Sequence, residues 1–187
     1  MIYIIDEFLR DNILNKLNNY LVNFKEFDAG DKKFWIMNST QDFDSWMVNK
    51  ISEIENKKIN NILSFFRIAT NELDTDWRIH CDSIINGQQP TRAIVLYLSD
   101  PGLEELNGTA LWEHKDYGYS LDNSELTSKK YDDLLLNHSN VLDNWKLNTV
   151  VGYRKNRLIS YPSNYFHSKY PNKCWEQGRK IYVMFYK

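Results

Sequence analysis

Two histidines of this chain are each followed by an aspartate two positions later, and such a pair can bind a metal ion. His80 and Asp82 lie at the end of a predicted strand that begins at Trp77. Residues i and i+2 of a strand point to the same face of a sheet, so this imidazole and this carboxylate can hold one ion. They supply two thirds of the two-histidine, one-carboxylate set that binds ferrous iron and leaves coordination positions open.

The spacing alone does not identify the site. His114 and Asp116 form a second pair with the same spacing, also at the end of a predicted strand. Chance supplies about 0.3 such pairs in a chain of this length and composition. Each pair also fits a surface histidine beside a solvated aspartate, so the surrounding sequence must decide between them.

The order of features after His80 favours the first pair. The chain continues through an apolar strand, a turn, a further strand, a histidine and a last strand that opens on an arginine, namely Ala93 to Ser99, Asn107-Gly108, Asn156 to Tyr161, His167 and Arg179. This succession resembles the iron(II)/2-oxoglutarate-dependent dioxygenases, in particular the prolyl-hydroxylase-like branch. The resemblance covers most of residues 61 to 187, and the N-terminal part more loosely.

The resemblance implies a role for five residues. His80, Asp82 and His167 would be the ligands of the catalytic iron. Arg179 would form a salt bridge with the C5 carboxylate of 2-oxoglutarate, and Tyr97 would donate a hydroxyl hydrogen bond to the same group. The sequence departs from the family pattern in three places. The step from His167 to Arg179 is twelve positions, which is slightly long, and one glycine stands at 108 where the family often has two. The third departure is an insert at 115–146.

The chemistry of Arg179 fits this role independently of the resemblance. A guanidinium is a planar fork that matches a carboxylate in two-point contact. Arg179 is one of only seven arginines and opens an otherwise apolar strand, where an unpaired charge is costly. Alternation along that strand places Ile181 and Val183 on the same face, so the side chain is expected to point into an apolar interior.

The elements that position these residues fall into three stretches of one domain, residues 1–187. Residues 1–58 are expected to form a strand over Ile2 to Ile5 and two supporting helices, with Asp11 and Asp42 as caps and a loop between the helices. Residues 61–114 and 147–186 are expected to be mainly strands. Without a βαβ alternation, this order predicts an antiparallel sandwich or barrel with helices on one outer face.

By resemblance, that fold is a double-stranded β-helix, the cupin-like jelly roll, mainly β with N-terminal helices packed against its major sheet. A polar, partly helical insert at 115–146 has no counterpart in the family pattern. Long irregular segments over a rigid scaffold commonly carry recognition, so this insert is expected to lie over the mouth of the metal site.

Composition narrows the class of protein. The chain has 187 residues, of which 42% are hydrophobic, and its formal charge is −2. It therefore lacks the excess of basic residues that would indicate a nucleic-acid partner. The longest apolar runs have strand length, which predicts neither a membrane span nor a signal peptide. Two cysteines fit a reducing compartment, and the expected location is the cytoplasm. Oligomeric state has no signature in the sequence.

The resulting prediction is an oxidoreductase that uses Fe(II), 2-oxoglutarate and O2. It would hydroxylate a C–H bond of a peptidyl or small-molecule substrate and release succinate and CO2. One alternative is a jelly-roll module that binds a ligand without turnover. A second is a metal-dependent hydrolase, since the same ligand set accepts zinc, although the sequence offers no evident general base for it.

Overall fold

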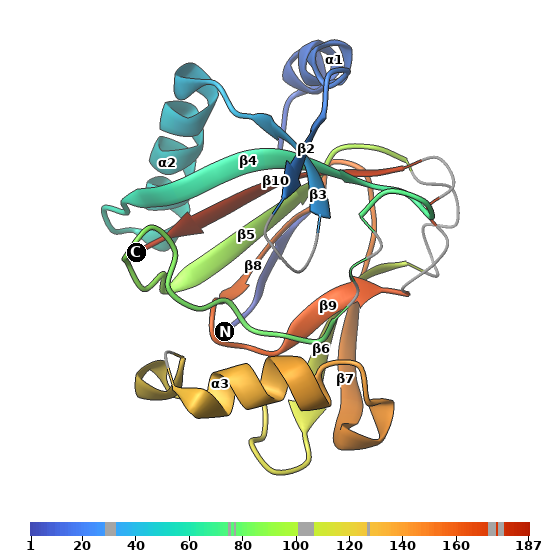
Figure 1. Cartoon of the computed structure of the whole chain (residues 1–187). Helices are drawn as coiled ribbons and strands as arrows, with labels where there is room; N and C mark the ends of the chain where they lie inside the picture. Colours follow the sequence, from blue (N-terminus) through green and yellow to red (C-terminus); the bar gives the residue numbers. More distant parts are fainter. Residues whose placement is uncertain are drawn as a thin grey trace.

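The computed structural model describes residues 1–28, 33–74, 76, 78–100, 107–126, 128–171, 175 and 178–187. Two antiparallel sheets form a double-stranded β-helix, the predicted jelly roll (Figure 1). The major sheet has the order β1-β8-β5-β10-β4-β3-β2, and the minor sheet has the order β7-β6-β9. The strands are β1 (Tyr3–Ile5), β2 (Lys25–Asp28), β3 (Lys33–Asn38), β4 (Asn61–Ala69), β5 (Arg92–Tyr97), β6 (Gly108–His114), β7 (Trp145–Gly152), β8 (Leu158–Pro162), β9 (His167–Tyr170) and β10 (Arg179–Tyr186).

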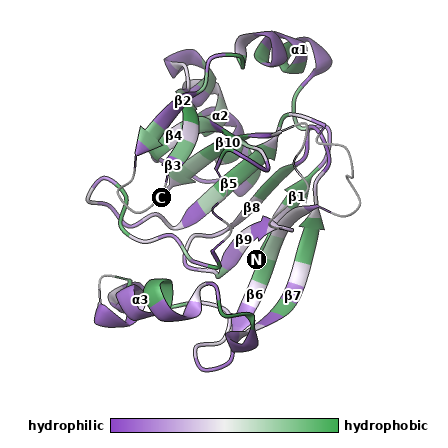
Figure 2. Ribbon diagram, turned by 45° about the vertical axis from the view of Figure 1, so that its right-hand side comes forward, coloured by the Kyte–Doolittle hydropathy of each residue, from purple (hydrophilic) through white to green (hydrophobic). Residues whose placement is uncertain are grey.

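Strand β10 is at the centre of the major sheet, and its alternating side chains separate two cores. It pairs with β4 and β5, with Ile181 opposite Arg67 on one side and Tyr97 on the other. Tyr182 and Met184 belong to the core beneath the helices, whereas Ile181 and Val183 belong to the core between the sheets. Hydrophobic residues, green in Figure 2, run along these central strands.

The two N-terminal helices cover the outer face of the major sheet, as expected (Figure 1). They are α1 (Asp11–Tyr20) and α2 (Gln41–Glu55). Their apolar stripes include Leu14, Met47 and Ile51, which pack on the core beneath the helices.

The caps of these helices differ from the prediction by one or two residues. The N-cap of α2 is Thr40, whose hydroxyl accepts a hydrogen bond from the Phe43 amide at 3.3 Å, and α1 has Arg10 at its N-cap position without a side-chain hydrogen bond. Asp11 and Asp42 are instead in the first turns, where a carboxylate interacts favourably with the helix dipole.

The expected loop between the helices contains a β-hairpin, β2 and β3, that extends the major sheet. Trp35 pairs with Ile68, and Phe27 pairs with Phe34. Every residue of β2 is exposed, so this strand has no apolar alternation by which the sequence could indicate it. The predicted strand ending at Asp82 is, in its described residues, a single bridge between His80 and His167.

The minor sheet explains the single glycine of the turn at 107–108. Gly108 lies on the central strand β6, opposite Gly152 of β7 and Tyr170 of β9. A Cβ atom added at Gly108 would stand 2.0 Å from the backbone oxygen of Val151. Any larger residue would therefore push β6 and β7 apart.

The insert packs on the outer side of the segment that carries His80 and Asp82. It contains α3 (Lys129–Asp133) and three short helical turns (Asn123–Glu125, Leu134–His138 and Leu142–Asn144), and Leu126 and Leu134 contact a core with Ile79 and Cys81. The Tyr131 hydroxyl donates to the Cys81 carbonyl at 2.8 Å. The expected position of the insert over the mouth stays a prediction. None of the described helices is both long and apolar enough to cross a membrane.

Candidate active site

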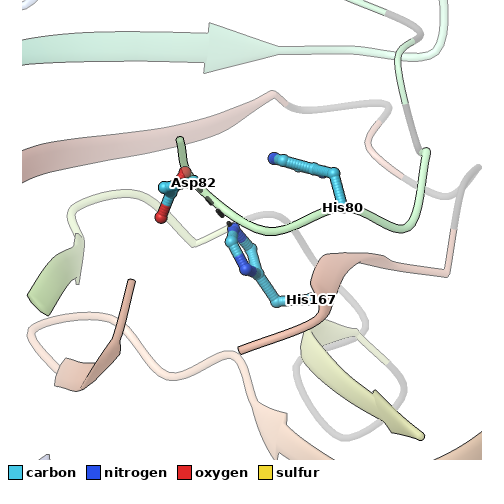
Figure 3. A group of neighbouring side chains, drawn as sticks. All are labelled: His80, Asp82 and His167. Carbon is cyan, nitrogen blue, oxygen red and sulfur yellow. Dashed lines mark ion pairs between the residues drawn. The ribbon is translucent and has the colours of Figure 1, made fainter. Parts of the chain in front are cut away.

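Three of the predicted site residues converge between the two sheets. His80, Asp82 and His167 each offer one ligand atom, and these atoms all lie within 4.8 Å of one another. Figure 3 shows the two imidazoles and the carboxylate directed toward a common region. His167 Nε2 lies 3.9 Å from Asp82 Oδ1, the contact drawn as a dashed line. We refer to these three residues as the open cluster.

Backbone pairing brings the two histidines together from positions 87 residues apart in the chain. The His80 amide donates to the His167 carbonyl at 3.0 Å, and the His167 amide returns the bond to the His80 carbonyl at 2.7 Å. Residues that exchange both bonds in an antiparallel pair are directly opposite, with side chains on the same face. The ring centroids are 4.5 Å apart. A third backbone hydrogen bond, from the Asp82 amide to the Ser163 carbonyl, fixes the carboxylate end of the segment.

Both imidazoles are held in a tautomer that leaves Nε2 able to bind a metal ion. His80 Nδ1 lies 2.8 Å from the Arg78 carbonyl oxygen, and His167 Nδ1 lies 2.8 Å from the Tyr165 carbonyl oxygen. A carbonyl oxygen can only accept, so Nδ1 must carry the hydrogen in each ring. In a neutral imidazole the lone pair is then on Nε2, which is the usual arrangement of metal-binding histidines.

The donor set fits one small divalent ion. In a facial arrangement with ligand distances of roughly 2.1 Å, neighbouring donor atoms stand roughly 3 Å apart. The 3.9 Å between His167 Nε2 and Asp82 Oδ1 must therefore shorten by about 1 Å on binding, which small side-chain rotations can supply. Cys81 points the other way into the core under the insert, and burial raises the pKa of its thiol to about 12. It is thus a packing residue and not a ligand.

The open cluster borders a cavity of about 100 Å³ between the sheets. Arg179 lines the same cavity and is only 4% exposed. Its Nη2 donates to the Thr109 hydroxyl at 3.2 Å, while its Nε is buried with no hydrogen-bond partner among the described residues. Within that part of the chain, no carboxylate forms an ion pair with Arg179. A buried cation in this condition is costly unless an anion reaches it.

Thr109 connects Arg179 to Tyr97. The Tyr97 hydroxyl lies 2.8 Å from the Thr109 hydroxyl, and the Tyr97 ring stacks on Tyr153 with centroids 4.1 Å apart. Burial raises the pKa of the Tyr97 phenol, so this hydroxyl keeps its proton and can donate. Thr109 lines the cavity, whereas Tyr97 is not among the lining residues. Sequence reasoning missed Thr109 because nothing in the pattern of β6 distinguishes it from a strand residue.

The second His-x-Asp pair lies elsewhere, against the insert. His114 is 1% exposed, and its Nε2 lies 2.8 Å from His138 Nδ1. Its Nδ1 accepts a hydrogen bond from the Asp116 amide at 3.1 Å. Neither His114 nor Asp116 lines the cavity.

Two further charged pairs border the cavity and were not singled out from the sequence. Arg67 forms an ion pair with Asp74, and Arg78 forms one with Asp76 at 3.1 Å. Lys169, two residues beyond His167, also contacts Asp74. Burial lowers the pKa of the Lys169 ammonium to about 8, although Asp74 opposes the shift.

Comparison with solved structures finds the same fold in proteins of low sequence identity. One is HygX from Streptomyces hygroscopicus, solved with nickel, 2-oxoglutarate and hygromycin B; it has 12% identity and a TM-score of 0.65, over 99% of this chain and 82% of HygX. Another is SnoK, a non-heme α-ketoglutarate-dependent carbocyclase from nogalamycin biosynthesis, with 12% identity and a TM-score of 0.64 over 99% of this chain and 78% of SnoK. A third is the epimerase SnoN, solved with Fe3+, α-ketoglutarate and nogalamycin RO. It has 11% identity and a TM-score of 0.62 over 99% of this chain and 78% of SnoN.

At these identities the likeness establishes the fold alone. No curated protein shows a significant match to the chain. A family match does exist, and it spans residues 37–172, from β3 through β9 and including all three residues of the open cluster. The chain therefore belongs to the family of unknown function DUF6445.

Proposed function

We propose that this protein is an iron(II)- and 2-oxoglutarate-dependent oxygenase. The observation that carries the proposal is the joint placement of two groups in one cavity: the open cluster, and a buried guanidinium without an acidic partner in the described part of the chain. A metal-binding set alone would fit many functions. A metal-binding set beside an unmatched cation fits a co-substrate that chelates a metal through one end and presents a carboxylate at the other.

The residues have distinct roles in this proposal. His80, Asp82 and His167 hold the iron, and Arg179 binds the C5 carboxylate of 2-oxoglutarate. Bound iron would supply the redox chemistry, in which 2-oxoglutarate and O2 give succinate and CO2 and a substrate C–H bond is oxidised. Hydroxylation is the simplest outcome of that chemistry.

In this proposal Thr109 takes part of the role that the family resemblance implies for Tyr97. The Thr109 hydroxyl lines the cavity beside Arg179, so it is placed to donate to the same carboxylate. Tyr97 holds the Thr109 hydroxyl at 2.8 Å and thus acts as a positioning residue. The apolar neighbours Ile181 and Val183 exclude water from this end of the cavity and strengthen the pairing of Arg179 with a carboxylate.

The test is an anaerobic titration of the purified protein with ferrous iron and then 2-oxoglutarate. The proposal predicts a visible metal-to-ligand charge-transfer band that saturates at one 2-oxoglutarate per chain. Exposure of this complex to O2 should then give succinate, slowly and without added substrate. Arg179→Met should weaken the binding of 2-oxoglutarate and leave iron binding intact.

The outcome also separates this function from a binding module without turnover. Iron binding with neither the band nor succinate would contradict the proposal and favour the module. If the band of Arg179→Met saturated at the same 2-oxoglutarate concentration as that of the wild type, the oxygenase proposal would stand. Arg179 would then not belong to the co-substrate site.

A further inference from the structure

Among the residues that the structure describes, the charges around the cavity do not balance, even before a metal ion is added. Four cationic side chains line it, namely Arg67, Arg78, Lys169 and Arg179. They face three carboxylates: Asp76 and Asp82 in the lining, and Asp74, which Arg67 and Lys169 contact. The described side chains therefore leave an excess of one positive charge. A divalent metal ion and the two carboxylates of 2-oxoglutarate cancel each other, so the excess remains when both are bound.

Arg67 is the side chain best prepared to meet a further anion. Its Nε and Nη2 donate to the two carboxylate oxygens of Asp74, the second at 2.5 Å. Its remaining terminal nitrogen, Nη1, has no hydrogen-bond partner among the residues described. A guanidinium fixed along one edge presents its other edge in a defined plane, which suits a carboxylate or phosphate.

Asp74, which fixes one edge of the Arg67 guanidinium, is itself held firmly in place. Its side chain is completely buried, and it also contacts the Lys169 ammonium, at 3.4 Å from Oδ1. Its backbone adopts a left-handed conformation with φ of 54°, which is uncommon outside glycine and is tolerated best by aspartate and asparagine. Residues in such conformations are kept where the surrounding structure requires them, often at ligand sites.

The surroundings of Arg67 are aromatic and apolar. The Phe34 ring packs under the guanidinium, with Cζ 4.3 Å from the ring centroid. Phe65, Val183 and Phe185 line the same cavity. A ligand that places an anionic group on Arg67 would therefore lay its apolar part against these side chains.

We propose that the substrate is a small molecule with an apolar or aromatic body and one anionic group, carboxylate or phosphate, and that Arg67 binds this group. The inference rests on the proposed function, because it takes Arg179 to be occupied by 2-oxoglutarate. It assigns the two arginines to two different anions: Arg179 to the co-substrate and Arg67 to the substrate.

The experiment compares three probes of one shape: phenylacetate, phenyl phosphate and the neutral phenylacetamide. Each is titrated into the full chain under anaerobic conditions with ferrous iron and saturating 2-oxoglutarate, and binding is followed by calorimetry and by amide chemical shifts. We expect at least one of the two anions to bind about 10-fold or more tightly than the amide, in line with a charged hydrogen bond. The stronger of the two identifies the anionic group.

Two arginine variants make the assignment specific. Arg67→Met should weaken anion binding by about 10-fold or more and leave 2-oxoglutarate binding unchanged, whereas Arg179→Met should do the reverse. Arg92→Met is the matched control, since Arg92 is also an ion-paired arginine, bound to Glu55 at 3.2 Å, but lies outside the cavity lining. It should alter neither titration.

The result that overturns this inference is equal binding of anion and amide to the wild type, or anion binding that survives in a folded Arg67→Met protein. The comparison of probes on the wild type remains decisive if Arg67→Met fails to fold, and Arg67→Lys then tests whether charge without the fork suffices. If 2-oxoglutarate does not bind but anions still depend on Arg67, the oxygenase proposal fails and the Arg67 site stands.

Discussion

Two His-x-Asp pairs end in opposite kinds of environment in this molecule. The open cluster borders a cavity and lies beside the Arg179 guanidinium, which has no acidic partner among the described residues. The other pair lies in what we call the closed cluster, His114, Asp116 and His138, which is packed against the insert. The two pairs share residue types, spacing and position at the end of a predicted strand, so none of these properties decides which one can bind a metal ion.

The difference lies in how the ring nitrogens are used. In the closed cluster, His114 Nδ1 accepts from a backbone amide and Nε2 contacts His138, whose own Nε2 lies 3.5 Å from Asp133. The His114 ring also stacks on Tyr117 and meets Trp145 edge-on. In the open cluster, each Nδ1 donates to a carbonyl two residues earlier in the chain, which leaves the Nε2 lone pairs directed to the ligand side. A backbone carbonyl that accepts from Nδ1 therefore indicates a candidate metal-binding histidine better than an aspartate two positions after the histidine does.

The largest effect should come from removing a ligand of the open cluster. His167→Ala should weaken divalent metal binding by more than about 100-fold, because loss of even an outer-sphere partner costs roughly 10–100-fold. The measurement is calorimetric titration with Co2+, an air-stable substitute for ferrous iron.

His114→Ala is the matched control, since it removes a histidine of the same motif from the closed cluster. Its metal affinity should equal that of the wild type. A loss of affinity in His114→Ala comparable to that in His167→Ala would show that the two clusters cannot be separated in this way.

The next effect concerns the cation beside the open cluster. Arg179→Met should weaken 2-oxoglutarate binding by roughly 10- to 150-fold, because hydrogen bonds to charged groups contribute about 1.5–3 kcal/mol. Metal binding should persist, since Arg179 offers no ligand atom. The readout is the 2-oxoglutarate dependence of the charge-transfer band, and the same variant should not change Co2+ affinity.

The variant that should leave metal affinity unchanged, His114→Ala, should lower the stability of the fold. His114→Ala removes a buried ring together with its contact to His138 and should lower the free energy of unfolding by about 1–3 kcal/mol. For a domain of this size that is roughly 2–12 °C in Tm. Thermal unfolding followed by circular dichroism measures it. An unchanged Tm would mean that the closed cluster contributes nothing to packing of the insert.

The sequence alone predicted the parts of the site that depend on local geometry. His80 and Asp82 share a face because they are two residues apart on an extended segment, and Arg179 shares a face with Ile181 for the same reason. The jelly-roll fold and the two helices outside the major sheet also followed from local patterns and the family resemblance.

What the sequence could not predict depends on contacts between distant residues. Thr109 reaches Arg179 across 70 positions, and Lys169 reaches Asp74 across 95. The exposed strand β2 and the four-residue strand β9 lack the apolar alternation that marks a strand. The core that Leu126 and Leu134 of the insert share with Ile79 and Cys81 is another such contact, since residues more than forty positions apart meet in it.

A smaller effect should separate the two hydroxyls beside Arg179. Thr109→Val removes one hydroxyl at nearly constant shape and should weaken 2-oxoglutarate binding by roughly 2- to 12-fold, since a neutral hydrogen bond contributes about 0.5–1.5 kcal/mol. Tyr97→Phe should have the smaller effect if Tyr97 acts only through Thr109. The two single variants and the double variant are compared by titration. Additive losses would show that Tyr97 contacts the co-substrate directly.

The smallest expected effect is a dependence of stability on pH that comes from the closed cluster. Burial, followed by the charge of His138, lowers the pKa of His114 below its ordinary value of 6.5. The unfolded chain therefore binds this proton more readily than the folded chain. The stabilising contribution of neutral His114 is fully present above pH 6.5 and is lost as the pH falls from there through the lower folded pKa.

Thermal unfolding of the metal-free chain between pH 7.5 and pH 5 should show this loss, and His114→Gln should reduce it because glutamine does not titrate in this range. We expect the two Tm profiles to converge toward acid pH, where the wild type no longer has the benefit of a neutral His114. Profiles that stay parallel over the whole range would mean that His114 takes up its proton as readily in the folded chain as in the unfolded one. The hydrogen bond from the Asp116 amide to Nδ1 would then have to break at little cost, and the closed cluster would be less firmly packed than its contacts indicate.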